Sequence, residues 1–164
     1  MMFLAFVVGI AALALLGDRL GIVSFPDWVS RLRLGLAAAL MFFGVDHFLS
    51  VGRYVPMIEG FVPFAEQVVL VTGACEIAGA IGLLVPATRR LAGIMLAIYF
   101  ICVFPANIAN AVNGLAVDGL PSSGWYYWVR LVFQPLYVWL ALFAAGIVTQ
   151  RQGPAALQPL PLRR

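Results

Sequence analysis

The sequence is short of charge and contains no lysine. Charged residues make up 10% of its 164 residues and hydrophobic residues 63%, whereas about 25% of a soluble globular chain is charged. This shortage excludes an ordinary soluble domain and indicates a polytopic membrane protein. Because segments that cross a hydrocarbon core of about 30 Å use most of the chain, we expect a single membrane domain.

Cysteine and metal-binding motifs are scarce as well. The two cysteines, Cys75 and Cys102, fall in separate apolar runs, without CxxC spacing or a metal-binding cluster. Buried thiols usually only pack, and a redox pair would need Cα atoms within about 7 Å, which spacing along the chain does not determine. No flavin or haem motif is present, so we expect no metal and no cofactor encoded in the chain.

Five apolar runs are candidate membrane helices: Met1 to Leu16, Arg31 to Ser50, Glu66 to Val85, Leu91 to Val112 and Trp125 to Val148. The first is short for a span, because Gly17, Asp18 and Arg19 interrupt it, and it also resembles the hydrophobic region of a signal peptide. It lacks the charged segment that precedes such a region. The runs predict an all-α polytopic membrane helix bundle.

The arginines supply all ten basic residues and predict the orientation. Positively charged short loops stay in the cytoplasm. Eight of the ten arginines fall on one side of the expected bundle, and only Arg53 and Arg130 fall on the other. The side with eight is predicted to be cytoplasmic, which places the N-terminus outside and the C-terminus inside a bacterial inner membrane. The net charge of +3 then reflects topology, and no nucleic-acid partner is expected. The other eight arginines are Arg19, Arg31, Arg33, Arg89, Arg90, Arg151, Arg163 and Arg164.

Three regions follow from this pattern. Residues 1–30 are predicted to form an N-terminal transmembrane helix and an interfacial linker, residues 31–150 the main membrane domain, and residues 151–164 a disordered cytoplasmic tail. The segment Val51 to Pro63 is apolar for a loop, yet it is too short and too broken by proline to cross the membrane. We expect it to form a cap on the outer face, packed against the bundle because irregular backbone needs protein or water around it.

Glu76 is a lone carboxylate near the middle of an apolar run. A charge at the bilayer centre costs about 2.5–3.5 kcal/mol on insertion scales, which makes an intramembrane acid a candidate for a functional site. Small residues share its helical face, including Thr72, Gly73 and Gly79. They serve either close helix packing or a ligand cavity. Glu76 itself is either a protonated acid bonded to a neighbouring helix or a group that binds a ligand and handles protons.

Asp46 and His47 end the second run, about one turn below the outer surface. His47 is the only histidine in the chain. It is either an interfacial side chain capped by a carboxylate or water, or a proton donor and acceptor near neutral pH. Asp46 is a candidate ligand-binding residue.

The fourth and fifth runs add polar groups at similar depth. Asn107, Asn110 and Asn113 recur every three residues and predict a polar stripe. Pro105 removes one backbone hydrogen bond, so a kink is expected there. Pro135 is expected to kink the last run in the same way, and it lies next to Gln134 and one turn from Arg130. These side chains either hold helices together, at about 0.6 kcal/mol per bond, or bind a ligand; the candidate ligand-binding residues are Asp46, Asn107, Asn110, Gln134 and Arg130.

Four segments carry a family resemblance in consistent order: RLRLGLAAALMFFGVDHF, TGACEIAGAIGLLVPATRRLAG, FPANIANAV and VRLVFQPLYVWLALF. From about Arg31 to Ala145 the chain resembles the DoxX-like family of small bacterial membrane proteins. The resemblance implies a four-helix membrane core, to which Met1 to Leu16 adds one helix. The family is named for a subunit of a thiosulfate:quinone oxidoreductase, and other members are linked to thiol or sulfur redox complexes.

Three functions remain open from the sequence. The first is a membrane subunit of a redox system that binds a quinone or similar apolar molecule and works with a partner protein, with Glu76 and His47 as catalytic residues that handle protons. The second is a non-catalytic accessory or scaffold subunit of a larger membrane complex. The third is a carrier of hydrophobic small molecules.

Overall fold

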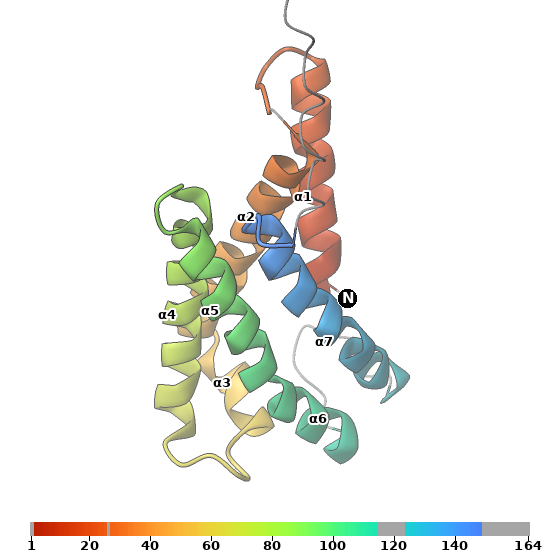
Figure 1. Ribbon diagram of the computed structural model, residues 1–164. Helices are drawn as coiled ribbons and strands as arrows, with labels where there is room; N and C mark the ends of the chain where they lie inside the picture. The colour runs from red at the N-terminus through yellow and green to blue at the C-terminus, as the bar shows by residue number, and fades with distance from the viewer. Residues whose placement is uncertain (1, 26, 115–123, 149–164) are drawn as a thin grey trace, which may run out of the picture.

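The computed structural model describes residues 2–25, 27–114 and 124–148, and in these ranges the chain is helical with no β-strand (Figure 1). This confirms the predicted all-α helical bundle. The predicted tail 151–164 and most of the loop after Asn113 lie outside the described residues. In chain order the elements are α1 (Met2–Arg19), α2 (Trp28–Leu49), α3 (Val51–Tyr54), the 3-10 turn η1 (Val55–Met57), α4 (Ala65–Leu84), α5 (Arg89–Cys102), α6 (Phe104–Asn113) and α7 (Gly124–Ala144).

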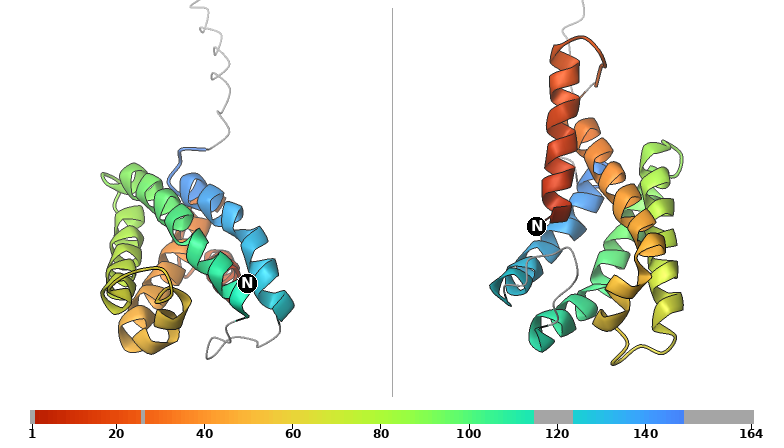
Figure 2. Two further views of the ribbon diagram at one scale, coloured as in Figure 1. Left: turned by 90° about the horizontal axis from the view of Figure 1, so that it is seen from below. Right: turned by 180° about the vertical axis from the view of Figure 1, so that it is seen from behind.

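Five helical segments of the described chain are long and apolar enough to cross a membrane: α1, α2, α4, α7 and the combined stretch Arg89–Asn113. Large apolar side chains such as Leu13, Val71 and Val132 are exposed on the outer faces of these helices. An exposed apolar surface of this extent fits a membrane protein. Seen from below, α4 and α7 lie on opposite sides of the bundle, with α5 between them (Figure 2).

Helix α1 is longer than the sequence predicted. We expected a break at Gly17, but the helix continues to Arg19. Asp18 is accommodated because its carboxylate binds the guanidinium of Arg31 and accepts a bond from the backbone N–H of Phe25. The chain turns instead at Gly21, whose φ of 70° suits glycine. The upper part of α1 extends beyond the other helices (Figure 2).

Helix α2 packs closely against α4 through glycines. A Cβ atom on Gly73 would lie 2.6 Å from the Cβ of His47 and 2.8 Å from the carbonyl oxygen of Gly44. A Cβ on Gly44 would in turn lie 3.0 Å from the carbonyl oxygen of Gly73. Among the small residues around Glu76, Gly73 therefore serves close packing against α2 and Gly79 lies against Leu96 of α5, whereas Thr72 lines the cavity under the cap.

The predicted kink at Pro105 is confirmed as a break between α5 and α6. Helix α5 ends at Cys102 and α6 begins at Phe104, with Pro105 in its first turn. The carbonyl oxygen of Phe100, near this break, accepts a bond of 2.9 Å from Nε2 of Gln134 on α7. Pro135, by contrast, lies inside a helix that continues through it.

The Val51–Pro63 segment forms the cap that the sequence predicted. It folds as α3 and η1 and packs against α2, α4 and α6. At the opposite end of the bundle, arginines bind the last carbonyls of helices: Arg33 Nε donates to Ala144 O over 2.7 Å and Arg89 Nε to Leu83 O over 3.1 Å. Cations at helix C-termini are favourable because the helix dipole is negative there.

Candidate functional site

A cavity of about 380 Å³ lies under the cap, between α2, α4, α5, α6 and α7. Its wall is mainly apolar, and it includes Phe3 from the first turn of α1. Five of the seven site residues predicted from the sequence line it: His47, Glu76, Asn107, Arg130 and Gln134. Pockets of 300–1,000 Å³ with apolar walls and a few polar groups are typical of small-molecule sites.

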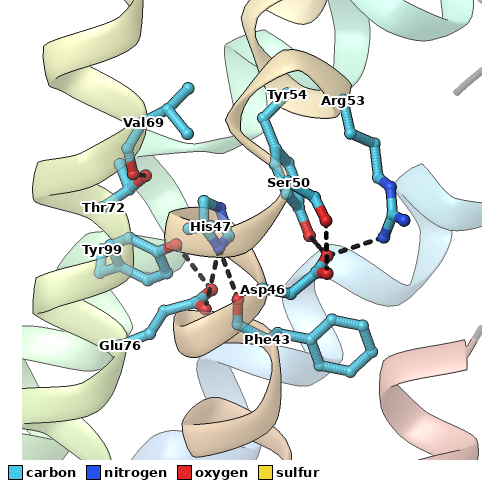
Figure 3. Close-up of polar contacts among 10 residues, drawn as sticks. All are labelled: Phe43, Asp46, His47, Ser50, Arg53, Tyr54, Val69, Thr72, Glu76 and Tyr99. Carbon is cyan, nitrogen blue, oxygen red and sulfur yellow. Dashed lines mark hydrogen bonds and ion pairs between the residues drawn. The ribbon is translucent and has the colours of Figure 1, made fainter. Parts of the chain in front are cut away.

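His47, Glu76 and Tyr99 form one polar cluster, although they come from three helices (Figure 3). The hydroxyl of Tyr99 donates to Oε1 of Glu76 over 2.7 Å, and Nδ1 of His47 lies 3.5 Å from Oε2 of the same carboxyl group. The close α2–α4 packing holds His47 beside Glu76, because Gly73 lies directly against the Cβ of His47. The acid and the histidine therefore lie within ion-pair distance of each other.

One oxygen of Glu76 has no hydrogen-bond partner among the described residues. Glu76 is 6% exposed, and its Oε2 atom is buried without a bond. Nearly all buried polar groups in proteins are hydrogen-bonded, so an orphaned one in a cavity wall calls for an explanation. A bound molecule or a water is the simplest partner for such an atom.

The ring of His47 is held from two sides. Its Nδ1 atom lies 2.7 Å from the carbonyl oxygen of Phe43, and the ring of Tyr54 stacks on it with 4.0 Å between ring centres. A carbonyl oxygen only accepts hydrogen bonds, so Nδ1 carries the hydrogen. Nε2 is then the ring nitrogen that remains for a ligand.

Asp46 organises the cap and does not line the cavity. Its carboxylate accepts bonds from Tyr54 over 2.5 Å, Arg53 over 2.7 Å and Ser50 over 3.1 Å. Burial raises the pKa of Tyr54, and the bond to Asp46 raises it further, so the hydroxyl stays protonated as a donor. Asp46 thus holds Tyr54, whose ring stacks on His47, and its ligand-binding role stays a prediction.

A second polar cluster joins α6 to α7 beside the α5–α6 break. Arg130 donates to Oδ1 of Asn107 over 3.1 Å, and Nδ2 of Asn107 lies 3.4 Å from Oε1 of Gln134. Nε2 of Gln134 also donates to the carbonyl oxygen of Phe100. Arg130 also lies over the ring of Tyr127, 6.0 Å from its centre. This cluster both holds the helices together and presents the cation of Arg130 to the cavity.

The predicted asparagine stripe is divided. Asn107 lines the cavity, Asn113 is exposed, and Asn110 is fully buried away from the cavity wall. Only one of the three meets the cavity because successive i, i+3 positions drift around the helix. The ligand-binding role of Asn110 stays a prediction. Neither of its side-chain polar atoms has a hydrogen-bond partner among the described residues.

The sequence reasoning missed Tyr99, Tyr54 and Phe3. Tyr99 carries a hydroxyl in an apolar run at the depth of the expected kink, which was a usable signal. Tyr54 lies in the predicted cap but offers no pattern that indicates stacking on His47. Cys102 lines the cavity and Cys75 does not, and both are free thiols. Among the described residues, no group of three or more histidines, cysteines or acids is placed to hold a metal ion.

Comparison with known proteins gives one family. The model of a domain of unknown function, DUF8561, matches residues 36–145, which lie within the predicted membrane domain 31–150 and leave out α1. No curated protein and no solved structure matches the chain. The resemblance to DoxX-like proteins is not tested by this match and stays a prediction. Since the match spans more than half of the chain, the protein belongs to the DUF8561 family.

Proposed function

We propose that this membrane protein binds a quinone or a similar apolar ring molecule in the cavity under the cap, as the membrane subunit of a redox system. The observation that carries the proposal is a buried Glu76 oxygen that lacks a hydrogen bond among the described residues and lies 3.5 Å from Nδ1 of His47, in the wall of a mainly apolar cavity of about 380 Å³. Such a wall suits a molecule that is apolar over most of its surface and polar at its edge.

Reduction of a quinone takes up two electrons and two protons, and its reversal releases them. Glu76 and His47 are the proton carriers in this proposal, because both side chains change protonation and both face the cavity. The electrons come from or go to a partner protein that carries its own redox group. A molecule soluble in the bilayer reaches the cavity without crossing water.

We also propose the orientation that the arginine count predicts, with the N-terminus outside and the C-terminus in the cytoplasm of a bacterial inner membrane. Support comes from the two ends of the bundle. Arg33 and Arg89 bind helix ends opposite the cap, whereas Arg53 and Arg130 lie at the cap end. A C-terminal green fluorescent protein fusion should fluoresce and a C-terminal alkaline phosphatase fusion should be inactive; the reverse result contradicts this orientation.

The first test is purification in mild detergent followed by mass spectrometry of the bound lipids and proteins. A quinone should travel with the wild-type protein, together with a redox partner. A partner without any ring compound would instead favour the scaffold function.

The second test replaces Glu76 with glutamine, which keeps size and hydrogen bonding but does not ionise. Quinone turnover by the membrane complex should fall at least about 100-fold, the scale of a lost proton-transfer group. Glu66→Gln is the matched control, because Glu66 is an exposed acid in the first turn of the same helix. Normal turnover in a correctly inserted Glu76→Gln protein contradicts the proton role.

A further inference from the structure

The hydrogen-bonding pattern around His47 says more about the ligand than its apolar character does. Resting on the proposed function, we propose that the cavity binds the reduced, hydroxyl-bearing form of its ring compound, a hydroquinone-type molecule, in preference to the oxidised quinone. One hydroxyl of this molecule donates to Nε2 of His47.

The tautomer of His47 is set by its own helix. Nδ1 lies 2.7 Å from the carbonyl oxygen of Phe43, one turn earlier in α2, and that oxygen has no hydrogen to give. This bond exists without any ligand. In the neutral imidazole the other nitrogen, Nε2, is therefore unprotonated and accepts a hydrogen bond.

No described residue donates a hydrogen bond to Nε2. The neighbouring hydroxyl groups are already committed: Tyr54 stacks on the ring but donates to Asp46, and Tyr99 donates to Oε1 of Glu76. The donor for Nε2 is therefore left to a water or a ligand in the cavity. A hydroxyl supplies it, and the carbonyl of a quinone does not.

Glu76 adds a second vacant position in the same corner. Its Oε2 atom is buried, unbonded and 3.5 Å from Nδ1 of His47. As a carboxylate it is another acceptor that lacks a donor. Nε2 of a neutral His47 remains an acceptor whether Glu76 is ionised or protonated.

Arg130 on α7 also lines the cavity and offers the opposite chemistry. A guanidinium group carries five N–H donors and no acceptor, and one of its nitrogens already donates to Asn107. A ligand oxygen that faces Arg130 must accept. The cavity therefore offers an acceptor at His47 and a donor at Arg130, which suit a ring with one hydroxyl donor and one oxygen acceptor, as a hydroquinone provides.

A matched ligand series tests this preference. The purified full-length protein in lipid nanodiscs is titrated anaerobically with tetramethylhydroquinone, its dimethyl ether and tetramethylbenzoquinone, and binding is measured by calorimetry. The hydroquinone should bind about tenfold more tightly than either of the others, which corresponds to one hydrogen bond to a buried acceptor. This comparison needs no variant and so does not depend on whether a variant folds.

The variant His47→Asn assigns the contact. An asparagine amide can still donate to the carbonyl of Phe43 from the position of Nδ1, but it has no atom at Nε2. The affinity for the hydroquinone should fall about tenfold, to the level of the ether.

The possible failures are distinguishable. Equal affinity for all three compounds overturns the donor preference and leaves the proposed ring-binding function standing. Tighter binding of the benzoquinone also overturns it, since the corner would then act as a donor. Binding of none of the three compounds contradicts the proposed function itself.

Discussion

Helix α2 meets its neighbours in two different ways, and His47 lies where they join. Toward α4 the backbones touch at Gly44 and Gly73, with no room for a methyl group. Toward α5 and α7 the space is left open as the cavity. The closed interface is built from the smallest residues, whereas the open one is lined by large aromatic side chains such as Phe100 and Tyr137.

The contrast shows that the glycines of the α2–α4 contact do not create this cavity. They remove space on one side, and by doing so they fix the position of His47 relative to Glu76. The open side is kept apart by the α5–α6 break and by the cap, whose hydrogen bonds centre on Asp46. Changes on the closed side should therefore alter stability and site geometry together, whereas changes on the open side should cost less stability.

The largest effect is expected at the closed interface, from Gly73→Ala. The new methyl group would lie 2.6 Å from the Cβ of His47 and 2.8 Å from a backbone oxygen of Gly44, neither of which moves easily. We expect a loss of about 3 kcal/mol in stability and a loss of ligand binding, measured by thermal unfolding in detergent and by calorimetry. Gly9→Ala in α1 is the control, since nothing lies within 4 Å of its added Cβ; equal behaviour of the two variants would refute tight packing.

The next largest effect is expected at the part of the cavity wall that α1 supplies. The ring of Phe3 meets Phe43, Phe100 and Tyr137 at centre distances of 5.5, 6.0 and 5.1 Å. Phe3→Ala should cost about 2 kcal/mol, less than for a fully buried ring because Phe3 is half-buried. It should also widen the cavity, so that a bulkier ring compound gains affinity relative to a smaller one. Unchanged selectivity would show that α1 is not part of the wall.

The open side also depends on a polar contact. Gln134→Leu removes the donor that the carbonyl of Phe100 uses near the helix break. We expect a cost of about 1.5 kcal/mol for a buried carbonyl left without its partner, seen as a lower unfolding temperature. The control is Glu59→Gln at an exposed site in the cap, which should leave stability unchanged. A neutral result for Gln134→Leu would mean that this bond does not stabilise the break.

Much of this architecture could be predicted from local pattern, and the failures have a common cause. The helices follow from apolar runs, the α5–α6 break from Pro105, and the cap from its prolines. The end of α1 was misplaced because Asp18 is compensated by Arg31, 13 residues away. Tyr99 was missed because its partner Glu76 is 23 residues distant. Which polar group meets which depends on helix rotation and crossing, and periodicity within one helix does not determine either.

The smallest effect is expected at Asp27, which lies far from both interfaces and caps α2. Its carboxylate accepts from the backbone N–H of Ser30 over 2.6 Å, and this bond, with a further one from the Ser30 side chain, lowers the pKa of Asp27. Asp27→Ala should cost about 1 kcal/mol without any change in ligand affinity. Loss of affinity in this variant would show that the site depends on the start of α2.

The pH dependence of this cap has a definite sign. Because the pKa of Asp27 is lower in the folded protein, its contribution is fully present above the unfolded value of about 3.9 and is lost as the pH falls through the folded value. The difference in unfolding temperature between wild type and Asp27→Ala should therefore shrink as the pH falls below about 4. A difference that stays constant over this range would rule out an ionised cap.

The most direct test of the central claim is to locate a bound ring compound on the chain. A photoreactive azidoquinone, activated in nanodiscs that contain the wild-type protein, should label residues of the cavity wall on α2, α4 and α5, such as Phe43, Thr72 and Phe100. Excess unlabelled quinone should suppress this labelling. Labelling confined to exposed residues such as Leu91 and Val132, with no competition by unlabelled quinone, would contradict the account.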